Sequence, residues 1–180
     1  MDALNLEKYE QAILFFAHTC NNLHLGKTKL MKLLYYLDFD HYERFDVPVT
    51  GDTYFKYPHG PVPSSAETVI DVMEHRGLLE KNTAVRGNYR QHRVNPLVAY
   101  DLSVFTDTER ETLLKVCERW SIASLSVIEG QTHLEAPWLA VEDWGEIPYE
   151  YAYYRNTFGA PDLSDEEGGY ISPEMVSSRM

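Results

Sequence analysis

Imidazole and carboxylate side chains are the groups in this sequence whose chemistry could support catalysis. His59 lies in a proline-rich turn, and His133 and Glu135 lie two residues apart near an expected helix start. If the fold gathers these three side chains in one pocket, they could form a metal-dependent or His/Glu-based hydrolase. However, no two of the seven histidines have the four-residue helical spacing that holds zinc, and the serines and cysteines lack the glycine-flanked elbow of a hydrolase nucleophile. We therefore predict a non-enzymatic protein without catalytic residues, cofactor or metal, and keep the hydrolase as an alternative.

Two further motifs match ligand sites only in part. The string LGKT at residues 25–28 matches the end of a phosphate-binding loop, but Asn21 stands where that loop requires a glycine. In the string DFDH, Asp38 and His41 share a helix face, yet a hard cation needs more converging oxygen ligands. We interpret LGKT as unrelated to nucleotide binding and DFDH as a solvated helix end.

Charge is distributed unevenly along the 180 residues. The formal net charge is −12, and residues 120–180 contribute −9 of it, with Arg155 and Arg179 against 11 acidic residues. A surface of this sign repels phosphate backbones and attracts basic proteins. No stretch approaches the roughly 18 apolar residues of a membrane span, and the N-terminal residues lack the features of a secretion signal. We expect a soluble, cytoplasmic protein that binds neither membranes nor, directly, nucleic acids.

Apolar side chains recur at spacings of three and four residues and predict about six helices. The expected start signals are Thr28 and the capping boxes Ser64/Glu67 and Thr106/Glu109, and the expected stop signals are Val47-Pro48, Gly77 and Gly159. Cys20 and Cys117 lie among apolar residues at helical spacing, so we interpret both as reduced core residues. The length suits one domain. We predict a compact, mainly α-helical domain over residues 1–159 and a flexible acidic tail over residues 160–180.

A short β-hairpin interrupts the helices. The segment LLEKNTAVRGNYRQHRVNP predicts two strands about a turn at Arg86-Gly87-Asn88. A helix followed by a basic hairpin has the order of a winged helix, so Arg86, Arg90 and Arg93 could form a wing that contacts DNA. The acidic net charge argues against this alternative, which stays open.

The segment YPHGPVPSSAE at residues 57–67 is the first candidate for partner recognition. Two prolines restrict the backbone and remove amide donors, so this segment cannot pair as an interior strand. The tyrosine and histidine beside them offer flat polar surfaces. We predict that the segment contacts a partner through Tyr57, His59, Gly60, Pro61, Val62 and Pro63. The alternative is a rigid connector that orients two helices.

The segment THLEAPW at residues 132–138 is the second candidate. Thr132 and Glu135 can cap a helix, which leaves His133 and Trp138 to pack or to bind. We add His133, Glu135 and Trp138 to the predicted partner-binding residues. A buried His-Glu pair beside a tryptophan can also be purely structural.

Taken in order, four segments closely resemble the Panacea domain of the SocA-like antitoxin family, which is also found among phage-associated proteins. They are GKTKLMKLLYYLDFDHYERF, TYFKYPHGPVPSSAETVIDVMEHRGLL, THLEAPWLA and IPYEYA. The resemblance runs from Leu6 to Phe158, and its most specific parts are KLMKLLYY, GPVP and the His-Glu-Trp trio. Compared with this family pattern, we expect no additional DNA-binding domain at either end of the chain, which puts regulation of its own operon in doubt.

The resemblance implies a small, mainly helical antitoxin that binds and blocks a separately encoded protein toxin, in some members by delivering it to an ATP-dependent protease. Toxins that attack nucleic acids or ribosomes tend to be basic, which suits the acidic C-terminal part of this chain. The resemblance leaves open which toxin is bound, whether it is blocked or delivered for degradation, and the oligomeric state.

Overall fold

The structure is a computed structural model that describes residues 4–20 and 25–157. It contains six α-helices within these ranges, together with a three-stranded sheet and a separate two-stranded hairpin. The predicted mainly α-helical fold with a small hairpin is confirmed. The predicted tail at residues 160–180 lies outside the described ranges. Within them, no helix is both long enough and apolar enough to cross a membrane.

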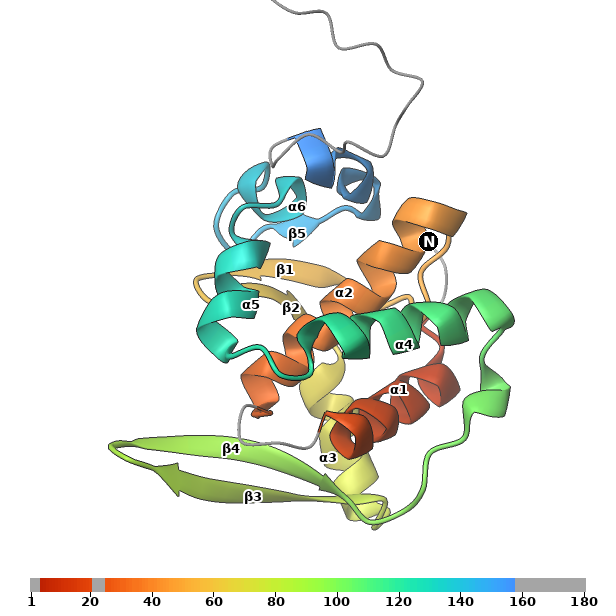
Figure 1. The fold of residues 1–180 in the computed structure, drawn as a ribbon, viewed down its shortest axis with the longest axis vertical. Helices are drawn as coiled ribbons and strands as arrows, with labels where there is room; N and C mark the ends of the chain where they lie inside the picture. The colour runs from red at the N-terminus through yellow and green to blue at the C-terminus, as the bar shows by residue number, and fades with distance from the viewer. Residues whose placement is uncertain (1–3, 21–24, 158–180) are drawn as a thin grey trace, which may run out of the picture.

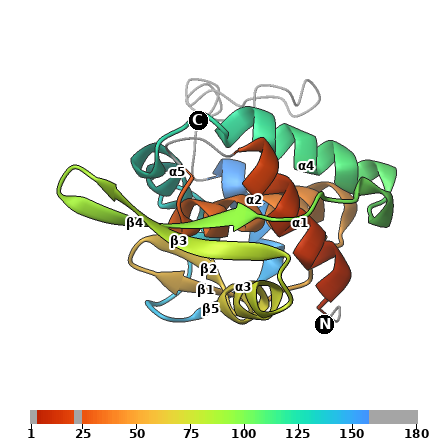
Figure 2. The same cartoon turned by 90° about the horizontal axis from the view of Figure 1, so that it is seen from below.

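Helix α2 (Lys27–Phe45) is the centre of the fold. It contacts α1 (Leu6–Thr19), α4 (Asp107–Trp120) and α5 (Leu125–Thr132), as well as strand β2 (Gly60–Pro63). Helix α4 and the three-stranded sheet lie on opposite sides of α2 (Figures 1 and 2). Because it is covered on several sides, α2 buries polar as well as apolar side chains along most of its length.

Of the three helix starts predicted from the sequence, one is confirmed and two differ in the structure. Thr106 and Glu109 form the predicted capping box of α4. Helix α2 begins after Gly26, not at Thr28, and the predicted box at Ser64 is absent. Helix α3 (Ala66–His75) begins one residue later, where the Asp52 carboxylate accepts hydrogen bonds from the Ser65 amide and from the hydroxyls of Ser64 and Ser65.

The GPVP segment is a strand at the edge of a sheet. Strand β1 (Tyr54–Tyr57) lies between β2 (Gly60–Pro63) and the short β5 (Glu146–Ile147), and both pairs are antiparallel. The Ser64 N–H donates to the carbonyl oxygen of Thr53 across this pair. Because the backbone hydrogen-bonding groups of successive strand residues point in opposite directions, the backbone nitrogens of Pro61 and Pro63 point away from β1. Their missing amide donors therefore cost the sheet no hydrogen bond, as expected for an edge strand.

The second hairpin extends away from the helices (Figures 1 and 2). Helix α3 ends before Gly77, whose φ of 73° places it in the left-handed region, as the predicted helix stop requires. Strands β3 (Leu79–Arg86) and β4 (Tyr89–Pro96) then pair about the predicted turn. The winged-helix-like order of helix and hairpin is thus present.

The remaining elements are short. A 3₁₀ turn η1 (Leu102–Val104) precedes α4, and α6 (Ala136–Leu139) follows α5. The last predicted helix is a 3₁₀ helix, η2 (Tyr149–Thr157), which packs on α2 and α6. It lies beside α6 at the end of the molecule opposite the β3–β4 hairpin (Figure 1).

The DFDH segment is buried, and its interpretation as a solvated helix end was wrong. Asp38 is fully buried and accepts hydrogen bonds from the amides of Val49 and Thr50 and from the hydroxyl of Tyr54. Burial raises the pKa of Asp38 to about 6, although the hydrogen bonds from Thr50 and Tyr54 favour the charged form. This carboxylate ties the loop after α2 back to the helix, which is a structural role.

Candidate functional site

Lys32 connects helix α2 to the GPVP strand. Its fully buried ammonium donates a 2.7 Å hydrogen bond to the carbonyl oxygen of Pro61 on the outer edge of β2. Burial lowers the pKa of Lys32 to about 7, an effect that the negative charge of Glu129 partly opposes. The prolines and this buried lysine together satisfy a strand edge that would otherwise be open to pairing.

Gly60 allows the strand to approach α5 closely. Its φ is 94°, and a Cβ atom at this position would lie 2.6 Å from Thr132 Oγ1 and 3.0 Å from Lys32 Cε. Only glycine meets both the backbone angle and the space. The sequence at Gly60-Pro61 therefore fixes how the β1–β2 turn sits on the start of the THLEAPW segment.

Glu135 holds a buried polar cluster on the α2 side of this segment. Its carboxylate accepts hydrogen bonds from the hydroxyls of Tyr35 (2.8 Å) and Tyr36 (3.1 Å). Arg155 Nη1 lies 3.9 Å from Glu135 Oε2. Burial raises the pKa of Glu135, while Arg155 and the two tyrosines oppose that rise. Arg155 also donates hydrogen bonds to Asp40 and Glu43 of α2, so the cluster joins α2, α6 and η2.

His133 and Trp138 form a stacked pair on the other side of the segment. Their ring centroids lie 4.2 Å apart at an angle of 29°, and the Lys56 ammonium lies 4.2 Å from the indole. Trp138 Nε1 donates a 3.2 Å hydrogen bond to the backbone oxygen of Tyr57. Burial lowers the pKa of His133, and among the described residues its Nε2 has no hydrogen-bond partner. This stack attaches the β1–β2 turn to α6.

The predicted partner-binding residues thus divide by exposure. Tyr57 and His59 are exposed, and His59 Nδ1 lies 3.0 Å from Glu129 Oε1. The half-buried residues are Val62, His133 and Trp138, and the buried ones are Gly60, Pro61, Pro63 and Glu135. We define the turn face as the surface made by Tyr57, His59, His133 and Trp138. The buried residues set its shape.

The hydrolase alternative requires His59, His133 and Glu135 to converge. His133 and His59 are both near Glu129, but the Glu135 carboxylate accepts hydrogen bonds from the α2 tyrosines. Within the described part of the chain, no cluster of three or more His, Cys, Asp or Glu side chains could hold a metal ion. The geometry found here therefore does not favour a metal site at these three residues.

The predicted wing contains Arg86, Arg90 and Arg93. Arg90 is exposed and lines a pocket at the start of α2, whereas Arg93 is half-buried and lines a neighbouring hollow with Lys27 and Lys81. The side chain of Arg86 lies outside the described part of the structure. Arg90 and Arg93 thus border two different hollows.

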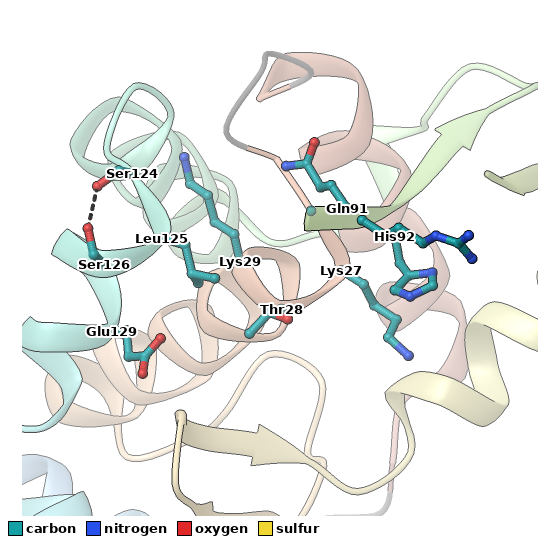
Figure 3. A pocket seen from close by; sticks show the side chains of 11 residues that line it. Lys27, Thr28, Lys29, Gln91, His92, Ser124, Leu125, Ser126 and Glu129 are labelled. Atoms are coloured by element: carbon teal, nitrogen blue, oxygen red, sulfur yellow. Dashed lines mark hydrogen bonds between the residues drawn. The ribbon is translucent and has the colours of Figure 1, made fainter. Parts of the chain in front are cut away.

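The pocket bordered by Arg90 has a volume of about 480 Å³ and contains the LGKT residues Gly26, Lys27 and Thr28. In Figure 3 the side chains of Lys27 and His92 lie on one side and those of Ser124, Ser126 and Glu129 on the other. The element before LGKT is helix α1, not the strand that a phosphate-binding loop requires. Lys27 pairs with Glu67, and Lys29 donates to the carbonyl oxygens of Ser121 and Ala123. The two lysines are thus already engaged within the chain.

Sequence reasoning missed several residues of the site. Lys32, Tyr35 and Tyr36 were part of a recognised motif, yet helical periodicity gave them no role beyond the core. Arg155 carried a usable signal, because it is one of only two arginines in an acidic segment without lysine, and such a residue is a natural partner for a buried carboxylate such as Glu135.

Comparison with known families identifies the fold. The family model described as "Antitoxin SocA-like, Panacea domain" matches residues 30–139. The chain belongs to this antitoxin family. The matched Panacea region begins within α2, ends with α6 and contains all nine predicted partner-binding residues. Comparison with curated proteins and with solved structures gave no match. Membership of the Panacea family supports an antitoxin role and suggests a non-enzymatic one.

Proposed function

We propose that this chain is the antitoxin of a toxin–antitoxin system and neutralises a separately encoded protein toxin by binding it. The observation that carries the proposal is the Panacea match over residues 30–139, whose most specific motifs contact one another at the turn face and in the buried layer beneath it. Lys32 of KLMKLLYY holds GPVP, and Trp138 of THLEAPW holds Tyr57. Motifs far apart in sequence therefore cooperate to build one exposed surface.

The chemistry of the surface supports binding over catalysis. The carboxylate of Glu135 is occupied by two tyrosine hydroxyls, and the imidazole of His133 is stacked on Trp138. Tyrosine, tryptophan and histidine rings on a rigid turn offer contact area at a low cost in conformational entropy. The acidic C-terminal part of the chain favours a basic toxin by electrostatic attraction.

The proposed mechanism is occlusion, in which the antitoxin covers the toxin's working surface. Delivery of the toxin to an ATP-dependent protease is the competing mechanism. The two differ in what happens to the toxin in cells: an occluded toxin accumulates in the complex, whereas a delivered toxin is lost unless the protease is absent.

Co-expression with the neighbouring gene tests the proposal. We expect the neighbour's product to stop growth alone, to be harmless together with this chain, and to co-purify with it in a fixed ratio. A neighbour that is harmless alone, or that does not co-purify with this chain, would overturn the antitoxin assignment. Measurement of toxin abundance with and without the protease then separates occlusion from delivery.

A further inference from the structure

Trp144 forms an exposed aromatic pair with Tyr57 of the turn face. Their ring centroids lie 4.9 Å apart in an edge-to-face arrangement at 77°. Trp144 is 62% exposed and Tyr57 is 42% exposed. Two large aromatic rings in contact form a continuous exposed apolar patch, and Trp and Tyr are among the residues most enriched at the energetic centres of protein interfaces.

The backbone at Trp144 is strained. Its φ of 67° lies in the left-handed region, which a bulky residue other than glycine rarely adopts. Such a conformation costs free energy and persists only where the surrounding structure imposes it. Here the strained residue presents its side chain to solvent and is not packed in the core, so core packing does not account for it.

Hydrogen bonds to strand β1 impose this conformation. The backbone N–H of Trp144 donates a 2.9 Å hydrogen bond to the carbonyl oxygen of Lys56. The backbone N–H of Lys56 donates another, also of 2.9 Å, to the carbonyl oxygen of Gly145. At Gly145 a Cβ atom would lie 2.7 Å from Val141 Cγ1 and 2.9 Å from Glu142 O, so the turn tolerates only glycine there. The turn that carries Trp144 is thus built into the sheet.

The Lys56 side chain fixes the same turn from inside. Its ammonium donates a 2.7 Å hydrogen bond to the carbonyl oxygen of Val141 and lies 3.4 Å from Asp143 Oδ1. The same ammonium lies over the ring of Trp138. The Lys56 side chain is 11% exposed, so little of its positive charge reaches the surface. The aromatic pair is therefore held in place before any partner arrives, which lowers the entropic cost of binding.

The sequence around Trp144 is acidic. Glu142, Asp143 and Glu146 flank Trp144 in the sequence, all three are exposed, and the Asp143 side chain is 83% exposed. An aromatic anchor with an acidic rim complements an apolar pocket with a basic rim. The same charges oppose nucleic acid and anionic membranes, and they oppose a second copy of this chain, which would bring two acidic rims together.

We propose that the Tyr57–Trp144 pair is the anchor of the toxin-binding surface and inserts into an apolar pocket with a basic rim on the toxin. This inference rests on the proposed antitoxin function and adds to the turn face a residue outside the matched family region. Trp144 supplies the buried contact, and the flanking carboxylates speed the encounter.

Substitution of Trp144 by glycine tests the anchor, with the neighbouring gene's product as the binding partner. Glycine adopts a φ of 67° without strain, so Trp144→Gly is expected to keep or raise the free energy of unfolding. The same variant is expected to weaken toxin binding by roughly 30-fold or more, the loss typical of an anchor residue. Tyr57→Ala is expected to weaken binding as well. A residue with a merely structural role would not separate binding from stability in this way.

Leu114→Ala is the matched control, because Leu114 is an exposed apolar residue (56%) on helix α4, away from the turn. We expect it to bind like the wild type, measured by titration calorimetry of the purified proteins. If the wild-type chain does not bind the neighbour's product, the antitoxin function fails and the anchor fails with it. If the wild type binds and Trp144→Gly and Tyr57→Ala bind equally well, the anchor alone is refuted.

Discussion

The ammonium of Lys32 donates its hydrogen bond to the carbonyl oxygen of Pro61, and this contact joins the central helix to the strand that forms the turn face. The Lys32 side chain is fully buried, although a lysine side chain in water at neutral pH carries a positive charge. The GPVP strand therefore stays on the body of the molecule through a buried polar contact as well as through apolar packing, and the contact depends on pH.

Lys32 should make stability rise with pH above neutrality. The folded chain releases the Lys32 proton near pH 7, whereas the unfolded chain keeps it up to its ordinary pKa of 10.5. Between these values the unfolded state binds more protons, so the Lys32 contribution to the free energy of unfolding increases with pH, by up to about 1.4 kcal/mol per pH unit. Lys32→Met should lose this increase. Urea unfolding of both proteins at about pH 7 and about pH 9 measures the free energy of unfolding at each pH. If this free energy changes equally with pH in the wild type and in Lys32→Met, then Lys32 is charged in the folded state.

Gly60→Ala should destabilise the fold more than Gly77→Ala. Both glycines have positive φ, so alanine costs about 1 kcal/mol at either position. Only at Gly60 would the new Cβ also meet Thr132 and Lys32, whereas Gly77 has open space. We expect a total loss of about 3 kcal/mol for Gly60→Ala, measured by denaturant unfolding. Equal losses in the two variants would mean that β2 moves away from α5 without cost.

Glu135→Ala should be strongly destabilising. It removes the acceptor of two buried tyrosine hydroxyls and leaves Arg155 with one carboxylate fewer, a loss of about 3 kcal/mol or more. Glu135→Gln keeps an acceptor and should cost less. Glu142→Ala, at an exposed carboxylate, is the control and should unfold like the wild type. A well-folded Glu135→Ala variant that has lost a measurable hydrolytic activity would instead support the enzyme alternative.

Cys20 and Cys117 should form a disulfide under mild oxidation. Both are free thiols, 97 residues apart in sequence, and their Sγ atoms lie 3.2 Å apart. The hydrogen bond from Cys20 lowers the pKa of Cys117 to about 6. Hydrogen peroxide should oxidise the Cys117 thiolate to a sulfenic acid, and the Cys20 thiol should then displace water to form the disulfide.

Thiol titration of the denatured protein measures this reaction. The wild type should lose both reactive thiols after peroxide treatment, and a reductant should restore them. Cys117→Ser should retain its single thiol after the same brief treatment. Two titratable thiols in the peroxide-treated wild type would show that the pair does not react.

Local patterns determined much of the fold from the sequence alone. The capping box of α4 and the stop at Gly77 depend on residues within a few positions of one another, so the sequence predicts them directly. The prolines of GPVP exclude an interior strand in any context, and β2 is accordingly an edge strand. Ser64 was predicted wrongly because the carboxylate that accepts from the Ser65 amide at this helix start belongs to Asp52, which lies 13 residues from Ser65 in the sequence.

The site depended on contacts that no local pattern contains. Glu135 meets Tyr35 and Tyr36 across about a hundred residues, and Trp144 meets Tyr57 only because β1 and the turn before β5 share backbone hydrogen bonds. Sequence spacing specifies which face of a helix or strand a side chain occupies, but packing decides what that face touches and whether a polar group is buried with a partner. The sequence thus determined the family, most of the helices and the β3–β4 hairpin, and it excluded an interior strand at GPVP. Only the tertiary structure decided that GPVP forms an edge strand, and which motif residues are buried supports and which are exposed contacts.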